Sequence, residues 1–372
     1  MSGPEVMIVA GEVSGDIHAG NLLEELGILV PGVRGFGVGG ERLDAAGLEC
    51  VARTEELAHM GLIEVLRELP RIRRVMHHLV YQARHRRPKV AVLVDSPDFN
   101  LRLAAQLRKL DIPVVLYVSP QLWAWRRGRV RVVRRLAREV LCILPFEIAF
   151  YEEHGVPARY VGHPLVDEVD RIGLLDHGSQ QRPGRLALLP GSRSMEVRQL
   201  LPVMIQTLRL IAPSEISEAV LVEAPGMEAE IDFLLSEHGS DSRILRVRGE
   251  ERRRLLSSSQ LAWTASGTAT LECALLGVPM VVGYRLQPIS FALAKLLVRV
   301  PNVALVNLIA GETLVPELLQ SDWRPERLGT ITAEMLRGGA VAQMKGLADA
   351  CDRLGKPGAS RKAAEAISEY LG

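Results

Sequence analysis

The sequence predicts an α/β protein with two Rossmann-like halves. Short apolar runs recur along the chain, and apolar residues at helical spacing lie between them, as at Leu103, Leu107 and Leu110. This alternation is typical of βαβ units and of a parallel sheet with ligand loops at the carboxyl ends of its strands. A polar, turn-rich passage at 176–185 interrupts the alternation, and a new apolar run follows. We expect domains at 1–168 and 169–345, and a helical tail, 346–372, that packs back on the first domain or on the second.

The candidate strands share a short, largely aliphatic run bounded by polar or turn-forming residues. They are 6–10, 89–95, 113–118 and 139–144 in the first half, and 186–189, 219–223, 261–264 and 279–284 in the second. The ends of these runs mark the loops where binding residues are expected.

Composition excludes several classes of protein. With 48% hydrophobic and 24% charged residues, the chain of 372 residues is globular and long enough for two domains. A formal net charge of +1 argues against nucleic acid as a partner, although arginines crowd 71–87 and 126–138. The four cysteines lack CxxC spacing, which favours free thiols in a reducing compartment. With neither a signal peptide nor a spanning apolar run, a cytoplasmic protein, soluble or peripheral to a membrane, is expected.

The first strand leads into AGEVSGDIHAG, residues 10–20, which reads as a strand-to-helix turn. Ser14 and Gly15 allow close backbone approach, but two acids, Glu12 and Asp16, replace the glycines of a dinucleotide fingerprint. Carboxylates there accept hydrogen bonds from sugar hydroxyls or cap a helix. The cap is favoured for Asp16, and Glu12 is left open.

The stretch DSPDFN, residues 95–100, ends the next strand with two carboxylates. Asp98 fits a cap of the following helix. Asp95 follows a buried run directly, and partial desolvation there would raise the pKa of its carboxyl group. Asp95 is therefore the better candidate for a general base acting on a hydroxyl nucleophile.

In the second half, the strand at 186–189 ends in Pro190, Gly191, Ser192 and Arg193 before a helical pattern. Backbone N–H groups at a helix start attract phosphate oxygens, and an arginine adds a bidentate fork. A tight turn with a solvated arginine is an equally good interpretation of the spacing.

A similar loop follows the strand at 261–264. Ser266, Gly267, Thr268 and Ala269 open a helix, and Glu272 lies one turn further on, where a carboxylate can hold a ribose diol. An ordinary N-cap explains the same serine and threonine without a ligand. Two phosphate-type loops in one half favour the ligand interpretation for both.

Other segments are less decisive. Trp123 and Trp125 fit an aromatic wall over a sugar or acyl chain, or simple packing. No metal-ligand spacing occurs, so neither a metal nor a cofactor is expected. The stretch 56–74 carries too many apolar residues for one narrow helical stripe beside a basic flank, which is compatible with burial or with an interfacial membrane contact. The apolar residues that form the candidate contact are Met60, Leu62, Ile63, Val65, Leu66 and Leu69.

Taken together, these residues resemble the lipid-A-disaccharide synthase family of bacterial glycosyltransferases. The matching motifs run in order from residue 10 to residue 320: AGEVSGD (10–16), MGLIEVL (60–66), DSPDFN (95–100), YVSPQLWAW (117–125), LPFE (144–147), VGHPL (161–165), LPGSR (189–193), SGTATLE (266–272), PMVVGYR (279–285) and VPELLQ (315–320). His18 departs from the small or apolar residue expected there.

The resemblance implies a GT-B fold, two Rossmann-like domains with parallel sheets facing across a cleft. It implies inverting, metal-independent transfer of 2,3-diacylglucosamine from its UDP donor to 2,3-diacylglucosamine 1-phosphate, giving a β-1,6 disaccharide and UDP. Asp95 is then the leading base, Asp98 the second choice and Arg193 the diphosphate ligand. The donor site also takes in Gly191, Ser192, the 266–269 loop and Glu272, with Asn307, Glu317 and Gln320 as further contacts.

The acceptor sugar is expected at Glu12, Ser14, Gly15 and Asp16. Acylated substrates place the enzyme on the inner face of the bacterial inner membrane, with the 56–69 stretch as its contact, as a monomer or a homodimer. Two other functions stay open: another GT-B enzyme of UDP-sugars, such as an N-acetylglucosaminyltransferase or a 2-epimerase, and a non-catalytic, membrane-associated sensor of UDP-sugars.

Overall fold

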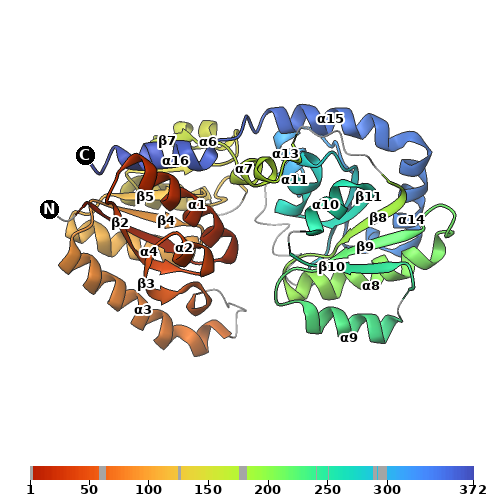
Figure 1. Ribbon diagram of the computed structural model, residues 1–372, viewed down its shortest axis with the longest axis horizontal. Coiled ribbons are helices and arrows are strands. Elements are labelled where there is room, and N and C mark those ends of the chain that lie inside the picture. The colour runs from red at the N-terminus through yellow and green to blue at the C-terminus, as the bar shows by residue number, and fades with distance from the viewer. Residues whose placement is uncertain are drawn as a thin grey trace. The chain divides into compact units, whose positions relative to one another are not determined.

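The computed structural model describes residues 3–57, 64–124, 127–175, 182–239, 241–249, 251–287, 291 and 300–372. The chain divides into two compact units. Unit 1 comprises Met1–Asp167 together with Lys356–Gly372, and unit 2 comprises Glu168–Gly355. Figure 1 shows each unit as a sheet with helices packed against it.

Unit 1 contains a seven-stranded parallel sheet in the order β3-β2-β1-β4-β5-β6-β7. Its strands are β1 (Glu5–Ala10), β2 (Arg34–Gly39), β3 (Glu49–Arg53), β4 (Val90–Val94), β5 (Val114–Tyr117), β6 (Glu139–Cys142) and β7 (Ala158–Tyr160). Its α-helices are α1 (Val13–Leu29), α2 (Glu41–Ala45), α3 (Glu64–Arg86), α4 (Pro97–Leu107), α5 (Val130–Leu136), α6 (Glu147–Glu153), α7 (Pro164–Arg171), which extends into unit 2, and α16 (Ala359–Ser368).

Unit 2 contains a six-stranded parallel sheet in the order β10-β9-β8-β11-β12-β13. Its strands are β8 (Arg182–Leu189), β9 (Glu218–Val222), β10 (Ile244–Val247), β11 (Ser259–Ala265), β12 (Met280–Tyr284) and β13 (Glu317–Leu319). Helices α8 (Ser194–Leu210), α9 (Glu228–His238), α10 (Glu251–Ser257), α11 (Thr268–Leu275), α13 (Leu305–Ala310), α14 (Pro325–Glu334) and α15 (Ala340–Asp352) accompany them.

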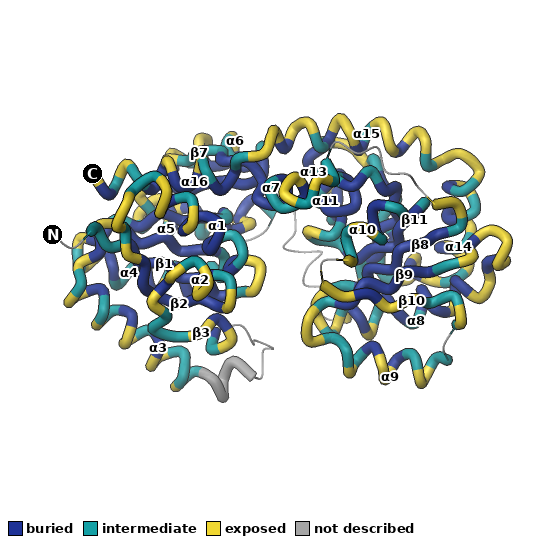
Figure 2. The backbone as a smooth tube through the Cα atoms, in the orientation of Figure 1, coloured by how far each residue is buried: buried dark blue, intermediate teal, exposed yellow. Residues whose placement is uncertain are grey.

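The central strands form the core of each unit. Every residue of β4 is buried, as expected for a parallel strand covered by helices on both faces, and Figure 2 shows the strands as the buried centre. In unit 2, the indole N–H groups of two buried tryptophans find acceptors: Trp263 donates to Thr332 Oγ1 (2.9 Å) and Trp323 to the Leu200 carbonyl (3.3 Å). All eight candidate strands are confirmed.

The chain returns to unit 1 at its C-terminus, where α16 packs against α1. Asp167 accepts hydrogen bonds from the backbone N–H groups of Gly358 (2.6 Å), Ala359 (3.1 Å) and Ser360 (2.9 Å), and so caps α16. In the described part of the chain, no helix is long and apolar enough to cross a membrane.

Candidate functional site

The carboxyl end of β4 carries an unusual backbone. Asp95 (φ 55°) and Ser96 (φ 38°) both adopt left-handed conformations, which are uncommon outside glycine. The buried Asn100 holds the bend, since its Nδ2 donates to the carbonyls of Val94 (3.1 Å) and Asp95 (2.7 Å). Two such residues in succession cost on the order of 1–3 kcal/mol each, and strain of this kind clusters at functional sites.

The first loop of unit 1 packs directly against this bend. A Cβ on Gly11 would lie 2.2 Å from Ser96 Oγ, so only glycine fits there. The strand order places β1 beside β4, and the carboxyl ends of parallel strands lie at one edge of the sheet. The structure therefore brings the loop at 10–16 and the loop at 95–98 together.

The two aspartates of DSPDFN differ in their surroundings. Asp95 is half-buried at the strand end, and its Oδ1 accepts the Ser96 N–H (3.0 Å). Asp98 lies exposed in the first turn of α4 and forms an ion pair with Arg129 (2.5 Å). The geometry favours Asp95 over Asp98 as the candidate base.

The structure gives Asp16 the capping role that the sequence favoured, although the helix that it caps is α2. This side chain is only 5% exposed, and its oxygens accept the backbone N–H groups of Gly40 (2.6 Å), Arg42 (2.9 Å) and Leu43 (3.2 Å). Asp16 therefore caps α2, because all of its close partners belong to the start of that helix.

The remaining candidates in this loop have different surroundings. Glu12 is the half-buried N-cap residue of α1 and makes no cap hydrogen bond through its side chain. Ser14 is exposed, and Gly15 is buried against Asp95 Cβ, to which a Cβ on Gly15 would lie at 3.5 Å. Of the loop's two acids, only Glu12 keeps a side chain without a structural bond in the described residues.

A buried carboxylate of LPFE organises the next two loops of the same edge. Glu147 Oε1 accepts hydrogen bonds from Ser119 Oγ (2.5 Å) and Trp123 Nε1 (3.0 Å), while Oε2 accepts the backbone N–H groups of Ile143 (3.2 Å) and Leu144 (3.1 Å). Desolvation raises the pKa of Glu147 to about 7. These contacts assign Trp123 to packing; Trp125 lies outside the described residues.

His163 orients a loop near α1. Its Nδ1 accepts the Leu165 N–H (3.1 Å), and burial together with the neighbouring His18 lowers the pKa of His163 to about 3. His163 is therefore neutral at physiological pH, with its proton on Nε2.

In unit 2, the loop between β8 and α8 holds the candidate residues Gly191, Ser192 and Arg193. Gly191 is left-handed (φ 115°), and a Cβ there would lie 2.5 Å from Glu196 Oε2. The same Glu196 oxygen accepts the Ser192 N–H (3.3 Å). Arg193 is 73% exposed and reaches Glu196 only at 3.4 Å, so its guanidinium remains accessible at the start of α8.

The loop between β11 and α11 is anchored from one side. Ser266 Oγ donates to the Val303 carbonyl (2.7 Å). The N-cap residue of α11 is Gly267, which has no side chain to cap the helix. Thr268 is exposed and Ala269 half-buried in the first turn. The first N–H groups of an uncapped helix are available to a ligand.

Asn307 has a structural role in unit 2. It is fully buried, and its amide is satisfied internally: Nδ2 donates to the Val315 carbonyl (3.0 Å) and Glu317 Oε1 (2.8 Å), and Oδ1 accepts the N–H groups of Leu314 and Val315 (2.8 Å each). These four bonds give Asn307 a structural role, and its expected donor contact stays a prediction.

Glu317 belongs to the same network as Asn307. Its carboxylate accepts the backbone N–H groups of Val303 (3.0 Å) and Ala304 (2.9 Å) ahead of α13. The Val303 carbonyl also accepts the hydrogen bond from the Ser266 hydroxyl. Glu317 and Asn307 therefore hold the segment that anchors the α11 loop.

Two other donor candidates are tied to neighbouring residues. Glu272 is buried, and its Oε1 accepts from Arg253 (2.7 Å) and Arg252 (3.2 Å); no described residue bonds to its Oε2. With the oxygen and nitrogen of its amide exchanged, Gln320 pairs with the backbone of Leu286. Its Nε2 donates to the Leu286 carbonyl (3.1 Å), and its Oε1 accepts the Leu286 N–H (3.2 Å).

The residues expected to contact the membrane lie largely outside the described part of the chain. Met60, Leu62 and Ile63 lie outside the described residues, Val65 and Leu66 are described only as backbone of α3, and Leu69 is half-buried. Over the described ranges, no group of three or more His, Cys, Asp or Glu side chains is placed to hold a metal ion.

Two Rossmann-like units, each with polar loops at the carboxyl edge of a parallel sheet, define a GT-B protein. Solved structures with this fold include UDP-GlcNAc 2-epimerase from Neisseria meningitidis bound to UDP-GlcNAc (TM-score 0.67, 13% identity, 98% of this chain and 100% of that chain). Another is Acinetobacter baumannii MurG (TM-score 0.60, 13% identity, 99% of each chain).

The family follows from sequence. The family model described as lipid-A-disaccharide synthetase matches residues 6–369. Lipid-A-disaccharide synthase from Anaeromyxobacter sp. (strain K) is 45% identical over 98% of this chain and 96% of its own length. The chain belongs to the lipid-A-disaccharide synthase family and is a glycosyltransferase of lipid A biosynthesis. The comparisons do not favour an epimerase, another transferase or a sensor.

Proposed function

We propose that this chain transfers 2,3-diacylglucosamine from its UDP donor to 2,3-diacylglucosamine 1-phosphate, with inversion and without a metal. The observation that carries the proposal is the strained Asp95–Ser96 bend beside Gly11. A strand end bent in this way presents a carboxylate at the edge of the sheet, where an inverting transfer needs a base for the acceptor hydroxyl.

On the donor side, Arg193 and the starts of α8 and α11 bind the UDP diphosphate. The exposed Arg193 guanidinium supplies a bidentate fork, and both helix starts supply backbone N–H groups. The same groups stabilise the negative charge that develops on the departing diphosphate. In this proposal, Glu272 contacts the ribose through Oε2, and Glu317 supports the α11 loop.

On the acceptor side, Asp95 removes the proton from the attacking hydroxyl. Glu12, Ser14 and Gly15 contact the acceptor sugar, and Asp16 fixes the adjoining start of α2. Because both substrates carry acyl chains, we place the protein on the inner face of the inner membrane, held there by the apolar residues of 60–69.

The test is UDP release measured with both acylated substrates and with each alone, for wild type and Asp95→Asn. We expect release that requires both substrates and a kcat lower by about 10²–10⁴ in Asp95→Asn, because a general base contributes on that order. UDP affinity should not change.

The matched control is Asp98→Asn, which removes a carboxylate from an exposed ion pair three residues away. It should affect kcat far less than Asp95→Asn. Release at an equal rate without the acceptor would refute the transfer reaction, whereas a fully active Asp95→Asn variant would remove only Asp95 from the role of base.

A further inference from the structure

A hollow in unit 1 lies outside the loops of the candidate active site. It measures 330 Å³ and is lined by Val130, Arg131 and Arg134 of α5 and by Glu153, His154 and Gly155 at the end of α6. Small-ligand sites begin at about 300 Å³, so the hollow suits a head group rather than a whole nucleotide sugar.

The hollow lies between α5 and the turn that follows α6. The turn at 153–155 follows α6 and precedes β7, which begins at Ala158. Helix α5 likewise leads down to the start of β6 at Glu139. The turn therefore lies toward the amino ends of the strands, whereas the start of α5 lies toward the carboxyl edge, where Arg129 pairs with Asp98.

The hollow carries concentrated positive charge. Arg131 and Arg134 stand three residues apart on α5 and so share one helix face, where like charges repel. The segment 127–138 holds six arginines and no acid. Within the described part of the chain, only Arg129 of these six forms an ion pair, with Asp98.

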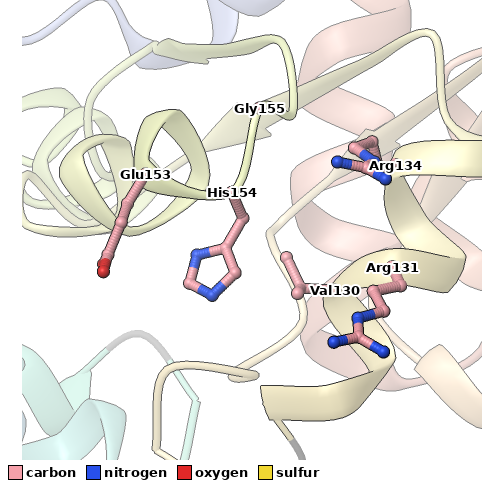
Figure 3. Close-up of a pocket in the computed structure, with 6 residues that line it drawn as sticks. All are labelled: Val130, Arg131, Arg134, Glu153, His154 and Gly155. Atoms are coloured by element: carbon pink, nitrogen blue, oxygen red, sulfur yellow. The ribbon is translucent and has the colours of Figure 1, made fainter.

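The other polar groups at the hollow leave this charge available. In Figure 3 the Arg131 guanidinium extends toward the side that carries His154, and the Glu153 carboxylate points away from both arginines. His154 Nδ1 lies 2.8 Å from the Phe150 carbonyl, to which it donates, and its Nε2 has no bond with a described residue. Arg131, Arg134 and His154 thus line one small space.

We propose that this hollow binds a phosphate group through the guanidinium groups of Arg131 and Arg134. A phosphate offers several oxygens to the two guanidinium forks, and its charge relieves the repulsion between neighbouring arginines. The same chemistry is carried by a phospholipid head group and by free phosphate, and the experiment separates these two sources.

The test compares two double variants with equal loss of charge. Arg131→Gln with Arg134→Gln removes the hollow's two arginines. Arg135→Gln with Arg138→Gln removes two arginines of the same segment that do not line the hollow. One arm measures inorganic phosphate binding by calorimetry, and the other measures co-sedimentation with phosphatidylglycerol vesicles against phosphatidylcholine vesicles. Circular dichroism and thermal unfolding verify that each variant folds.

We expect the Arg131/Arg134 variant to lose affinity by about tenfold or more in at least one arm, because two charge-assisted hydrogen-bonding groups are removed. The Arg135/Arg138 variant should stay close to wild type. A loss confined to vesicles identifies a head group, and a loss with inorganic phosphate identifies a general phosphate site.

Phosphate also has a candidate site at Arg193, so the difference between the two double variants is the readout rather than total binding. Equal losses in both doubles would mean that only general charge matters, and this outcome overturns the proposal. Unchanged binding of the Arg131/Arg134 variant in both arms overturns it as well.

Discussion

Asp16 shows why the role of a single acid cannot be predicted from its own stretch of sequence. The pattern AGEVSGD predicts correctly that a carboxylate lies after the first strand and favours a cap. The helix that it caps begins more than twenty residues further along, at Gly40 and Arg42. A partner so distant in sequence becomes visible only when β1 and β2 lie side by side.

Asn307 and Trp123 follow the same logic. Each lies in a family motif or close to one, and each is buried with its polar atoms bonded inside the protein. Sequence identifies the residue types that chemistry requires. It does not identify which of them are satisfied internally, because that depends on burial.

Glu147 provides a prediction at this scale. Its pKa is raised from 4.5 to about 7, so the folded protein holds a proton that the unfolded chain has already released in this range. The stabilisation associated with this proton is complete below pH 4.5 and is lost as the pH approaches 7. In Glu147→Gln, this pH dependence is absent.

The stability advantage of wild type over Glu147→Gln should therefore shrink by about 1–3 kcal/mol between pH 4.5 and 7, and stay constant above. Urea unfolding at a series of pH values measures this difference. The exposed Glu152→Gln on the same helix is the control and should show no such trend. A wild-type advantage that is flat over this range would contradict the prediction.

At the scale of elements, the strands that sequence missed lack the apolar run used to find the others. Strand β2 is RGFGVG, in which glycine alternates with larger residues. Strands β7 and β13 have three residues each, and β10 is a partly exposed edge strand. Their pairing with longer neighbours, rather than their own hydrophobicity, makes them strands.

The start of α8 yields the second prediction. Arg193→Ala should weaken UDP binding by about 10- to 100-fold, because an arginine–phosphate interaction contributes on the order of 1.5–3 kcal/mol. Arg193→Lys should recover only part of this affinity, since lysine keeps the charge but loses the fork. Calorimetric titration with UDP measures both.

Arg198→Ala is the control for this element. Arg198 lies on the same helix and is occupied by Glu230 at 2.7 Å. Its removal should change UDP affinity by less than about threefold. Equal losses in Arg193→Ala and Arg198→Ala would indicate that the charge of α8, rather than the fork of Arg193, determines UDP affinity.

For the whole molecule, the division into two sheets was predictable because each half repeats the strand and helix alternation. The return of the chain to unit 1 was open in the sequence, since the amphipathic pattern of the last helix suits either sheet. Packing resolves it: Asp167 caps α16, and Arg159 pairs with Glu369 (2.7 Å). The buried residues of α16 are Ala359, Ser360, Ala363, Ala364, Ala366 and Ile367.

A chain that ends at Gly355 should therefore lose stability in unit 1 alone. Removing α16 uncovers the apolar face of α1, and we expect a loss of about 3–5 kcal/mol for the free energy of unfolding of that unit. Calorimetry should show one transition moved to lower temperature and the other unchanged. UDP affinity should be kept, because the proposed donor loops belong to unit 2.

The control is Glu369→Gln, which removes only an exposed ion pair and should lower the free energy of unfolding by less than about 1 kcal/mol. If both transitions move together in the shortened chain, unit 1 and unit 2 do not unfold independently, and the role assigned to α16 is wrong.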